Sequence, residues 1–229
     1  MYWQDREDKG KQYVVPDDVI DLSFKVQCKQ LPLDHAYDLY RAIQAELTWM
    51  TEETQAGIHL IHGAESGNGW IRPQEPDALL SLSRRTRFML RLPKHRIPEA
   101  KQLAGRRMQV GAHELILSQP HEKLLSSQTT IFARYIVTDH LTDEAAFLDQ
   151  ADRLLRDQGI HARKMMSGRA HVLRMPGDNL ATRSLMIDSL EKEESIHLQQ
   201  HGLGPGRKVG CGLFLPHKGI DAVRQSQEK

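Results

Sequence analysis

The chain has 229 residues, of which 39% are hydrophobic and 27% charged, and its 31 Lys and Arg side chains nearly balance 30 Asp and Glu side chains. This composition is typical of a soluble globular protein and excludes a disordered, fibrous or uniformly basic one. No apolar run reaches the roughly 18 residues that span a bilayer, and the charged N-terminus is unlike a secretory signal. With Cys28 and Cys211 as its only cysteines, the chain is expected to be cytoplasmic, with no membrane partner, no disulfide framework and no four-cysteine zinc site.

The first elements predicted along the chain are an arm, a strand and a helix. Residues 1–15 mix charged and aromatic side chains, which indicates an arm or the beginning of an edge strand. Residues 19–28 alternate apolar and polar side chains, the pattern of a half-buried strand. Asp34 is expected to cap a helix over residues 35–50, because its carboxylate can accept backbone N–H groups and apolar residues recur three and four positions apart.

The remainder of the first half predicts three strand regions and a short helix. A short strand over 58–65 leads into a glycine-rich turn over 66–69. Residues 79–92 predict one long strand, with leucines and Phe on one face and arginines on the other. Pro98 begins a short helix that ends at Gly105. The segment 107–117 that follows forms either a pair of strands or one bent strand.

The second half repeats the order of elements. A strand over 129–137 precedes a helix that Thr142 is expected to cap and Gly159 to end. Residues 163–175 and 182–187 flank a turn and predict a hairpin. A helix over 190–201 follows, with Asp188 and Glu191 spaced as a capping box, and then a final strand over 209–215.

Both halves therefore read β-α-β-β-α-β, the ferredoxin-like order. The fold class expected is α+β, with two tandem ferredoxin-like domains. We place an N-terminal arm at 1–15, one domain at 16–120, and a second domain at 126–229 that contains a glycine-rich loop at 202–212.

The glycine-rich segment 202–212 contains five glycines. It lacks the Gly-Lys-Ser/Thr ending of a phosphate-binding P-loop and the spacing and position of a dinucleotide fingerprint. Residues without a Cβ let a backbone approach a ligand closely, and exposed amides beside Arg207 and Lys208 suit phosphate groups. A tight connection between a helix and a strand, with incidental charge, explains the same residues.

This segment resembles the C-terminal glycine-rich loop of the repeat-associated RAMP superfamily, of pattern G-h-G-x-x-x-x-x-G-h-G. Gly202, Gly204, Gly210 and Gly212 match its glycines, with Leu203 at an apolar position. Within that superfamily the chain resembles the CRISPR-associated endoribonucleases that cut precursor CRISPR RNA within the repeat. The stretches HLIHGAESGNGW, RRTRFMLRLPKHR and LGPGRKVGCGLF resemble the subgroup tied to MYXAN-type loci.

The resemblance implies two ferredoxin-like domains and a reaction that needs neither a metal nor another cofactor. In that reaction the RNA 2′-hydroxyl attacks the adjacent phosphate, which leaves a 2′,3′-cyclic phosphate and a 5′-hydroxyl, and the enzyme retains the mature RNA. Expected partners are CRISPR repeat RNA and other subunits of a CRISPR effector complex. Two alternatives are a non-catalytic RAMP subunit that binds the processed RNA, and a ferredoxin-like module that binds a small molecule or a metal.

Histidines are the candidates for proton transfer in this reaction, since the unperturbed pKa of about 6.5 lies near neutral pH. The resemblance points to the region after the first helix, where His59 is favoured and His62 is the second choice. His35, at the start of that helix, and Tyr40, within it, are further candidates. His59 and His62 have the spacing of metal ligands, but no convincing third and fourth ligands accompany them.

Three basic sets are candidates for RNA contacts, because structured RNA is recognised mainly through phosphates, 2′-hydroxyls and shape. The first lies on one strand face, the second lies in the second-half hairpin, and the third lies in the glycine-rich loop. A solvated strand face explains any one set alone, whereas three sets on adjoining elements favour a groove. Their members are Arg85, Arg87 and Arg91; Arg163, Lys164, Arg169 and Arg174 with Arg183 on the partner strand; and the loop residues Arg207 and Lys208 with the amides of Gly202, Gly204, Gly206, Gly210 and Gly212.

Overall fold

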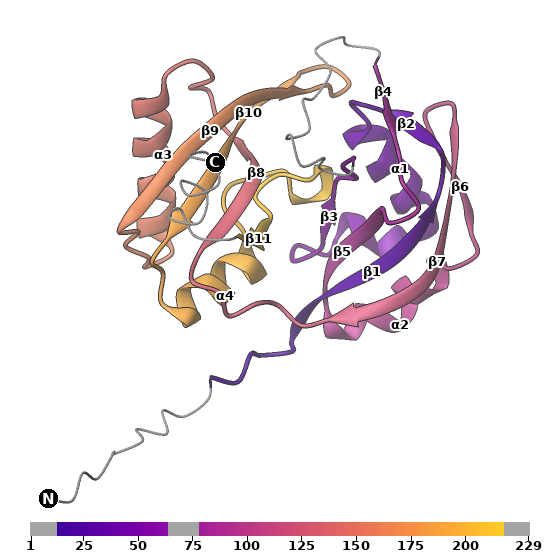
Figure 1. The fold of residues 1–229 in the computed structure, drawn as a ribbon, viewed down its shortest axis with the longest axis horizontal. Helices are drawn as coiled ribbons and strands as arrows, with labels where there is room; N and C mark the ends of the chain where they lie inside the picture. Colours follow the sequence, from indigo (N-terminus) through magenta and orange to yellow (C-terminus); the bar gives the residue numbers. More distant parts are fainter. Residues whose placement is uncertain (1–12, 64–77, 218–229) are drawn as a thin grey trace, which may run out of the picture.

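The structure is a computed structural model that describes residues 13–63 and 78–217. Two main β-sheets lie side by side, one from each half of the chain (Figure 1). Most of the expected arm over 1–15 and the whole expected turn over 66–69 lie outside the described residues. In the part of the chain that the structure describes, no helix has the length and apolar character needed to cross a bilayer.

The first sheet has five antiparallel strands in the order β3-β5-β1-β7-β6. Without the edge strand β6, this order is that of a ferredoxin-like sheet, and it confirms the expected fold of this half. The alternation of β1 buries Leu22 and Phe24 beneath the helices, opposite Leu90 and Phe88 of β5. The strands are β1 (Val19–Gln27), β3 (Gly57–His59), β5 (Arg87–Pro93), β6 (Arg107–Val110) and β7 (His113–Lys123).

Helices pack on one face of this sheet. The main helix is α1 (Ala36–Glu46), and its buried Leu39 and Ile43 join the core that the strands form. The shorter helical segments are η1 (Thr48–Thr51), η2 (Lys94–Arg96), α2 (Ile97–Ala100) and η3 (Lys101–Leu103). The opposite face of the sheet contacts the second half, through Arg91 of β5.

The prediction of a single strand over residues 79–92 is wrong. Its first part is β4 (Leu79–Ser81), which pairs with β2 (Gln30–Pro32) in a separate two-stranded sheet. The Thr86 N–H donates to the Ser83 carbonyl, and the Ser83 N–H donates to the Thr86 hydroxyl, so a turn separates β4 from β5. Alternation of side chains cannot detect this turn, because its polar residues continue the pattern.

The second sheet has the order β11-β8-β10-β9, again the ferredoxin-like arrangement. Phe147 and Leu155 of α3 pack against Leu185 and Ile187 of β10 to form its core. The elements are β8 (Ile131–Val137), α3 (Glu144–Asp157), β9 (Lys164–Leu173), β10 (Leu180–Asp188), α4 (Lys192–His201), η4 (Arg207–Val209) and β11 (Phe214–Pro216). Because β7 extends to Lys123, the first sheet continues beyond residue 120, where we placed the end of the N-terminal domain, and into the expected join before residue 126.

The three predicted helix caps are each displaced. Asp34 does not cap α1; His35 is the N-cap residue, without a side-chain cap bond. The cap of α3 is Asp143 rather than Thr142, and its carboxylate accepts the Ala146 N–H. The capping box of α4 is formed by Glu191 and Glu194, since Asp188 still belongs to β10.

A buried charged cluster joins the two halves. The Asp21 carboxylate accepts two hydrogen bonds from Arg91, at 2.8 and 2.9 Å, and the Arg91 side chain is fully buried. Nη1 of Arg91 also donates to the carbonyls of Gln199 and Phe214, which belong to the second half. The expectation that Arg91 faces RNA is therefore wrong, because its face of β5 at this position is covered by the second sheet's domain.

Candidate functional site

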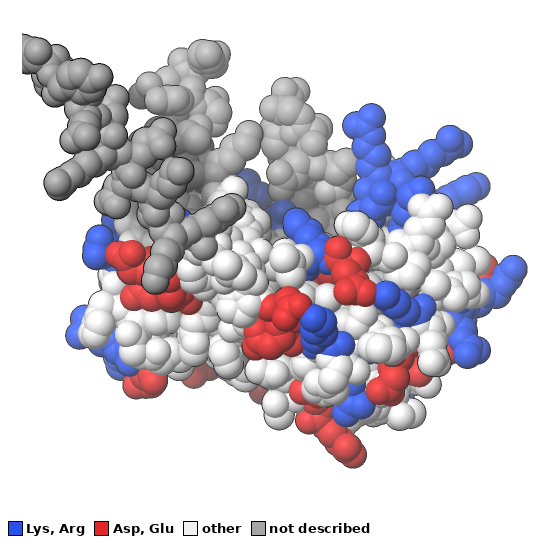
Figure 2. Space-filling model, turned by 90° about the horizontal axis from the view of Figure 1, so that it is seen from below, with Lys and Arg blue, Asp and Glu red and all other residues white. Residues whose placement is uncertain are grey.

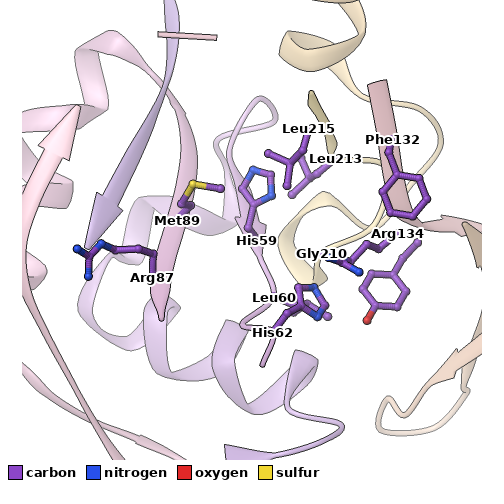
Figure 3. Close-up of a pocket in the computed structure, with 11 residues that line it drawn as sticks. His59, Leu60, His62, Arg87, Met89, Phe132, Arg134, Gly210, Leu213 and Leu215 are labelled. Atoms are coloured by element: carbon purple, nitrogen blue, oxygen red, sulfur yellow. The ribbon is translucent and has the colours of Figure 1, made fainter. Parts of the chain in front are cut away.

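A pocket of about 180 Å³ lies where the two halves meet (Figure 3). Its walls are the ends of β3 and β5 on one side, and β8 with the glycine-rich loop and β11 on the other. The residues that line it are His59, Leu60, His62, Arg87, Met89, Phe132, Arg134, Tyr135, Gly210, Leu213 and Leu215. It combines imidazoles, guanidinium groups and aromatic rings, which can move protons, bind phosphate and stack on bases.

His62 is the half-buried imidazole of this pocket. Its ring stacks on that of Tyr135, with centroids 6.0 Å apart and planes 26° apart. The chain just before it is fixed by His35, whose Nε2 accepts the Ile61 N–H while Nδ1 donates to the Pro32 carbonyl. These two bonds require the tautomer of His35 that carries its proton on Nδ1. His35 therefore positions the backbone just before His62 and does not itself line the pocket.

His59 is buried on the inner wall of the pocket, with 8% of its surface exposed. Its Nε2 lies 3.8 Å from the Asp21 carboxylate, in the cluster that joins the halves. Burial lowers the pKa of His59. The positive charges of Arg91 and Arg207 also lower it, whereas the negative charge of Asp21 raises it. Although burial would raise the pKa of Asp21, Arg91 holds it well below its usual range. Burial thus favours the neutral form of the His59 imidazole, which lies beside a buried carboxylate.

Two arginines supply positive charge to the pocket. Arg87 is exposed and extends from β5 on one side, while Arg134 of β8 lies beside Gly210 on the other (Figure 3). The Arg134 guanidinium lies 5.8 Å from the centroid of the Phe132 ring. Sequence reasoning identified Arg87 but missed Arg134, Phe132 and Tyr135. An arginine in an otherwise apolar strand was the available signal.

The glycine-rich loop of the second half packs against the N-terminal half of the protein. Nη2 of Arg207 donates to the carbonyls of Gln55 and Gln200, and the Lys208 ammonium donates to the Thr51 carbonyl. Burial and the nearby Arg91 charge lower the pKa of Arg207 to about 10. Both cations thus dock the loop onto the N-terminal half, and the expectation that they also contact RNA stays a prediction.

The glycines of this loop are required by its own packing. A Cβ on Gly202 would lie 2.5 Å from the Gly212 carbonyl oxygen, and one on Gly212 would lie 2.5 Å from the Leu203 oxygen. At Gly210, where φ is +90°, a Cβ would lie 2.5 Å from Cγ of Leu60 in the other half. These contacts support a structural role for the loop. Gly204 and Gly206 are partly exposed and remain candidates for RNA contact.

The remaining predicted residues are distributed around this junction. Tyr40 packs against the core of the N-terminal half and does not line the pocket. Lys164, Arg169 and Arg174 are exposed on or just after β9, and the Arg174 N–H donates to the Asp34 carboxylate across the junction. In contrast, Arg183 is buried and donates to Ser167, Leu141 and Gly168.

Exposed cations continue from the pocket over the N-terminal half. Figure 2 shows Lys and Arg side chains gathered at the right-hand end of the molecule, on the side of the N-terminal half. Arg87 pairs across the sheet with Lys25, which lines a groove of about 900 Å³ together with Lys29 and Arg84. Arg85 is exposed in the adjoining turn. Within the described ranges, no cluster of three or more His, Cys, Asp or Glu side chains could hold a metal ion.

Comparison with known proteins gives consistent matches along most of the chain. A family model described as "Cas6 Crispr" matches residues 20–219. A protein of Myxococcus xanthus (strain DK1622), named CRISPR-associated endonuclease Cas6, is 32% identical over 197 residues, which are 86% of this chain and 81% of that protein.

Solved structures show the same fold at low identity. One titled "CRISPR associated protein Cas6" has a TM-score of 0.59 and 12% identity, over 87% of this chain and 100% of that one. Another, titled "Characterization of a Cas6-related gene from Pyrococcus furiosus", has a TM-score of 0.58 and 14% identity, over 86% of this chain and 97% of that one. These likenesses concern the fold alone.

Proposed function

Because this chain belongs to the Cas6 family of CRISPR-associated proteins, we propose that it cleaves precursor CRISPR RNA within the repeat, by attack of a 2′-hydroxyl on the adjacent phosphate and without a metal ion. The observation that carries the proposal is the pocket at the junction of the halves, where His62, Arg87, Arg134 and Tyr135 meet. The family supplies the substrate class, and these side chains supply the groups that such a cleavage requires.

The reaction moves two protons and builds up negative charge on a phosphate. The 2′-oxygen loses its proton as it bonds to phosphorus, and the bond from phosphorus to the 5′-oxygen breaks as that oxygen gains a proton. The products are a 2′,3′-cyclic phosphate and a 5′-hydroxyl. His62 transfers one of these protons, since an imidazole can act as an acid or a base near neutral pH.

His62 suits this role better than His59, the histidine favoured from sequence. Both line the pocket, but the His59 ring is buried beside Asp21 and the charges of Arg91 and Arg207. The His62 ring is partly exposed and packs on Tyr135. We assign proton transfer to His62 and the support of the inner wall to His59.

Arg134 and Arg87 stabilise the charge that develops on the phosphate. Guanidinium groups form paired hydrogen bonds with phosphate oxygens, and such donors act most strongly when they are already in position. Phe132, beneath the Arg134 guanidinium, offers a surface for stacking of a base. Removing one such charged donor lowers a rate by roughly 10²–10³-fold in well-studied enzymes.

The RNA strand leaves the pocket over exposed cations. On the N-terminal side these are Lys25, Lys29, Arg84 and Arg85, around the larger groove. On the other side the path follows β9, whose cations are Lys164, Arg169 and, just beyond it, Arg174. Contacts on both sides of the cut explain retention of the product, because the part carrying most of the contacts dissociates slowly.

Cleavage assays with repeat RNA test this proposal. The protein is expected to cut at one position in the presence of EDTA. A single 2′-deoxy substitution on the 5′ side of the cut is expected to abolish cleavage and leave binding intact. Loss of cleavage in EDTA, or normal cutting of the deoxy substrate, would contradict the chemistry. Binding without cutting of any repeat RNA would favour the alternative of a non-catalytic RAMP subunit.

A further inference from the structure

We propose that His171 is the second proton-transfer residue of the cleavage, paired with His62 across the ring of Tyr135. The proposal rests on the function proposed above and deepens it. It makes the active site composite, because His62 follows β3 in the first half and His171 lies on β9 in the second. Neither half alone then holds both imidazoles.

Three rings in contact carry the inference. The Tyr135 ring stacks with that of His62 at 6.0 Å, and it meets the His171 ring edge-on at 5.6 Å, with an interplanar angle of 68°. Tyr135 is 5% exposed, whereas both imidazoles are partly exposed. Both imidazoles therefore contact one buried aromatic ring; His62 and Tyr135 line the pocket, and His171 reaches it through its contact with Tyr135.

The position of His171 is fixed by the docking of β9 onto the N-terminal half. Leu173, two residues further along, is buried with Ala36, Tyr135 and Cys211 in a small apolar cluster between the halves. The following residue donates its N–H to Asp34, as described above. On the other side, the buried Thr182 hydroxyl donates to the His171 carbonyl at 3.0 Å. Such contacts on both sides hold the backbone of His171 in one place.

Other histidines near the pocket suit the role less well. His59 lines the pocket but is buried, with 8% of its surface exposed, and its Nε2 lies 3.8 Å from the Asp21 carboxylate, so it is less accessible to a substrate than the partly exposed His171. The His217 ring contacts Phe132, at 5.7 Å and 52°, rather than Tyr135. His217 therefore lies at the part of the pocket that contains Phe132 and Arg134, and not at the Tyr135 ring, on which His62 stacks.

The chemistry gives the pair complementary tasks. One imidazole, neutral at the start, takes the proton of the 2′-hydroxyl as the bond from that oxygen to phosphorus forms. The other, protonated at the start, gives its proton to the 5′-oxygen as the bond from phosphorus to that oxygen breaks. Each imidazole ends the reaction in the protonation state opposite to the one in which it began, and proton exchange with water restores both. Losing either proton transfer is expected to slow cleavage by roughly 10²–10⁴-fold.

The test uses a substrate with sulfur in place of the bridging 5′-oxygen at the cut. A thiolate leaves without being protonated, so this substrate does not need the general acid. Single-turnover rates are measured for wild type, His62→Ala and His171→Ala on the normal and sulfur substrates. His161→Ala is the matched control, since His161 is exposed and precedes the opposite end of β9. Binding affinity is measured for each variant.

If the pair is correct, both variants cut the normal RNA at least 100-fold more slowly and bind it as wild type does, and the sulfur substrate restores the rate of one variant only. The inference is overturned if His171→Ala cuts normal RNA at the wild-type rate, or if sulfur restores both variants or neither. A His171→Ala variant that has lost binding also overturns it. Failure of wild type to cut any repeat RNA would instead overturn the proposed function.

Discussion

Replacement of Arg91 by Met is expected to cause a large loss of stability, because it leaves a carboxylate buried without its partner. In the wild-type protein Arg91 is fully buried, forms two hydrogen bonds with Asp21, and donates to two carbonyls of the second half. Arg91→Met removes all four bonds and preserves much of the apolar volume. Asp21, 4% exposed, would keep only its 3.8 Å contact with His59 among the ion pairs of the described residues.

The size of this loss follows from the burial of the pair. Breaking a buried ion pair by removing one member costs about 3–5 kcal/mol. Leaving a buried group without its hydrogen bond costs about 1–3 kcal/mol. This applies to the two carbonyls that lose Nη1 of Arg91, but part of their cost is already included in the cost of breaking the ion pair. We expect a total of about 4 kcal/mol, a large part of the usual 5–15 kcal/mol of folding stability.

Urea unfolding followed by circular dichroism measures this loss, with the free energy extrapolated linearly to water. Arg87→Met is the matched control, since Arg87 lies on the same strand but is exposed, and it is expected to change stability by less than about 0.5 kcal/mol. The double variant Asp21→Leu with Arg91→Met removes both charges and is expected to recover much of the loss.

Two outcomes would refute this reasoning. One is a loss below about 1 kcal/mol for Arg91→Met, which would mean that the pair is hydrated or easily replaced. The other is a double variant at least as unstable as the single one, which would mean that packing rather than charge causes the loss.

Three other predictions follow from the junction. Because burial lowers the pKa of His59 below its ordinary value of 6.5, the unfolded chain binds the extra proton first. Stability is therefore expected to fall as the pH drops below about 6.5, by at most about 1.4 kcal/mol per pH unit for this group, and His59→Gln should flatten urea-derived stability between pH 7.5 and 5.5. Gly210→Ala should cost about 2 kcal/mol or more in the same assay, since its φ is +90° and its Cβ would meet Leu60; an unchanged midpoint would contradict the packing of the loop. Replacing Arg87 and Arg134 together by Gln should reduce the slope of log affinity for repeat RNA against log salt by roughly 1.4–1.8, the value for two phosphate contacts; an unaltered slope would remove them from the interface.

The order of elements could be predicted from the sequence because each strand and helix shows its own period. Alternation identified β1, the three-to-four spacing identified α1, and Gly159 marked the end of α3. Such periods depend on which face of an element is buried, which is a local property. The turn between β4 and β5 escaped because its residues kept the alternation of the strands beside it.

The candidate site was predictable only in part, because it depends on contacts between the halves. Arg87 and Arg91 occupy equivalent places in the strand pattern, yet one is exposed and the other fully buried under the second half. The glycines of the loop have the same signature whether a ligand or another backbone approaches them. Tyr135 and His171 appear in the sequence as ordinary strand residues, and only the packing of β8 and β9 against the first half brings them to His62.

The measurement that most directly tests the account is the single-turnover cleavage rate of repeat RNA by His62→Ala. The exposed His95, which lies beside Glu53, provides the control variant His95→Ala. We predict that His62→Ala binds the RNA as wild type does and cuts it at least about 100-fold more slowly, while His95→Ala cuts at the wild-type rate. Cleavage by His62→Ala at the wild-type rate would contradict an active site at the junction pocket.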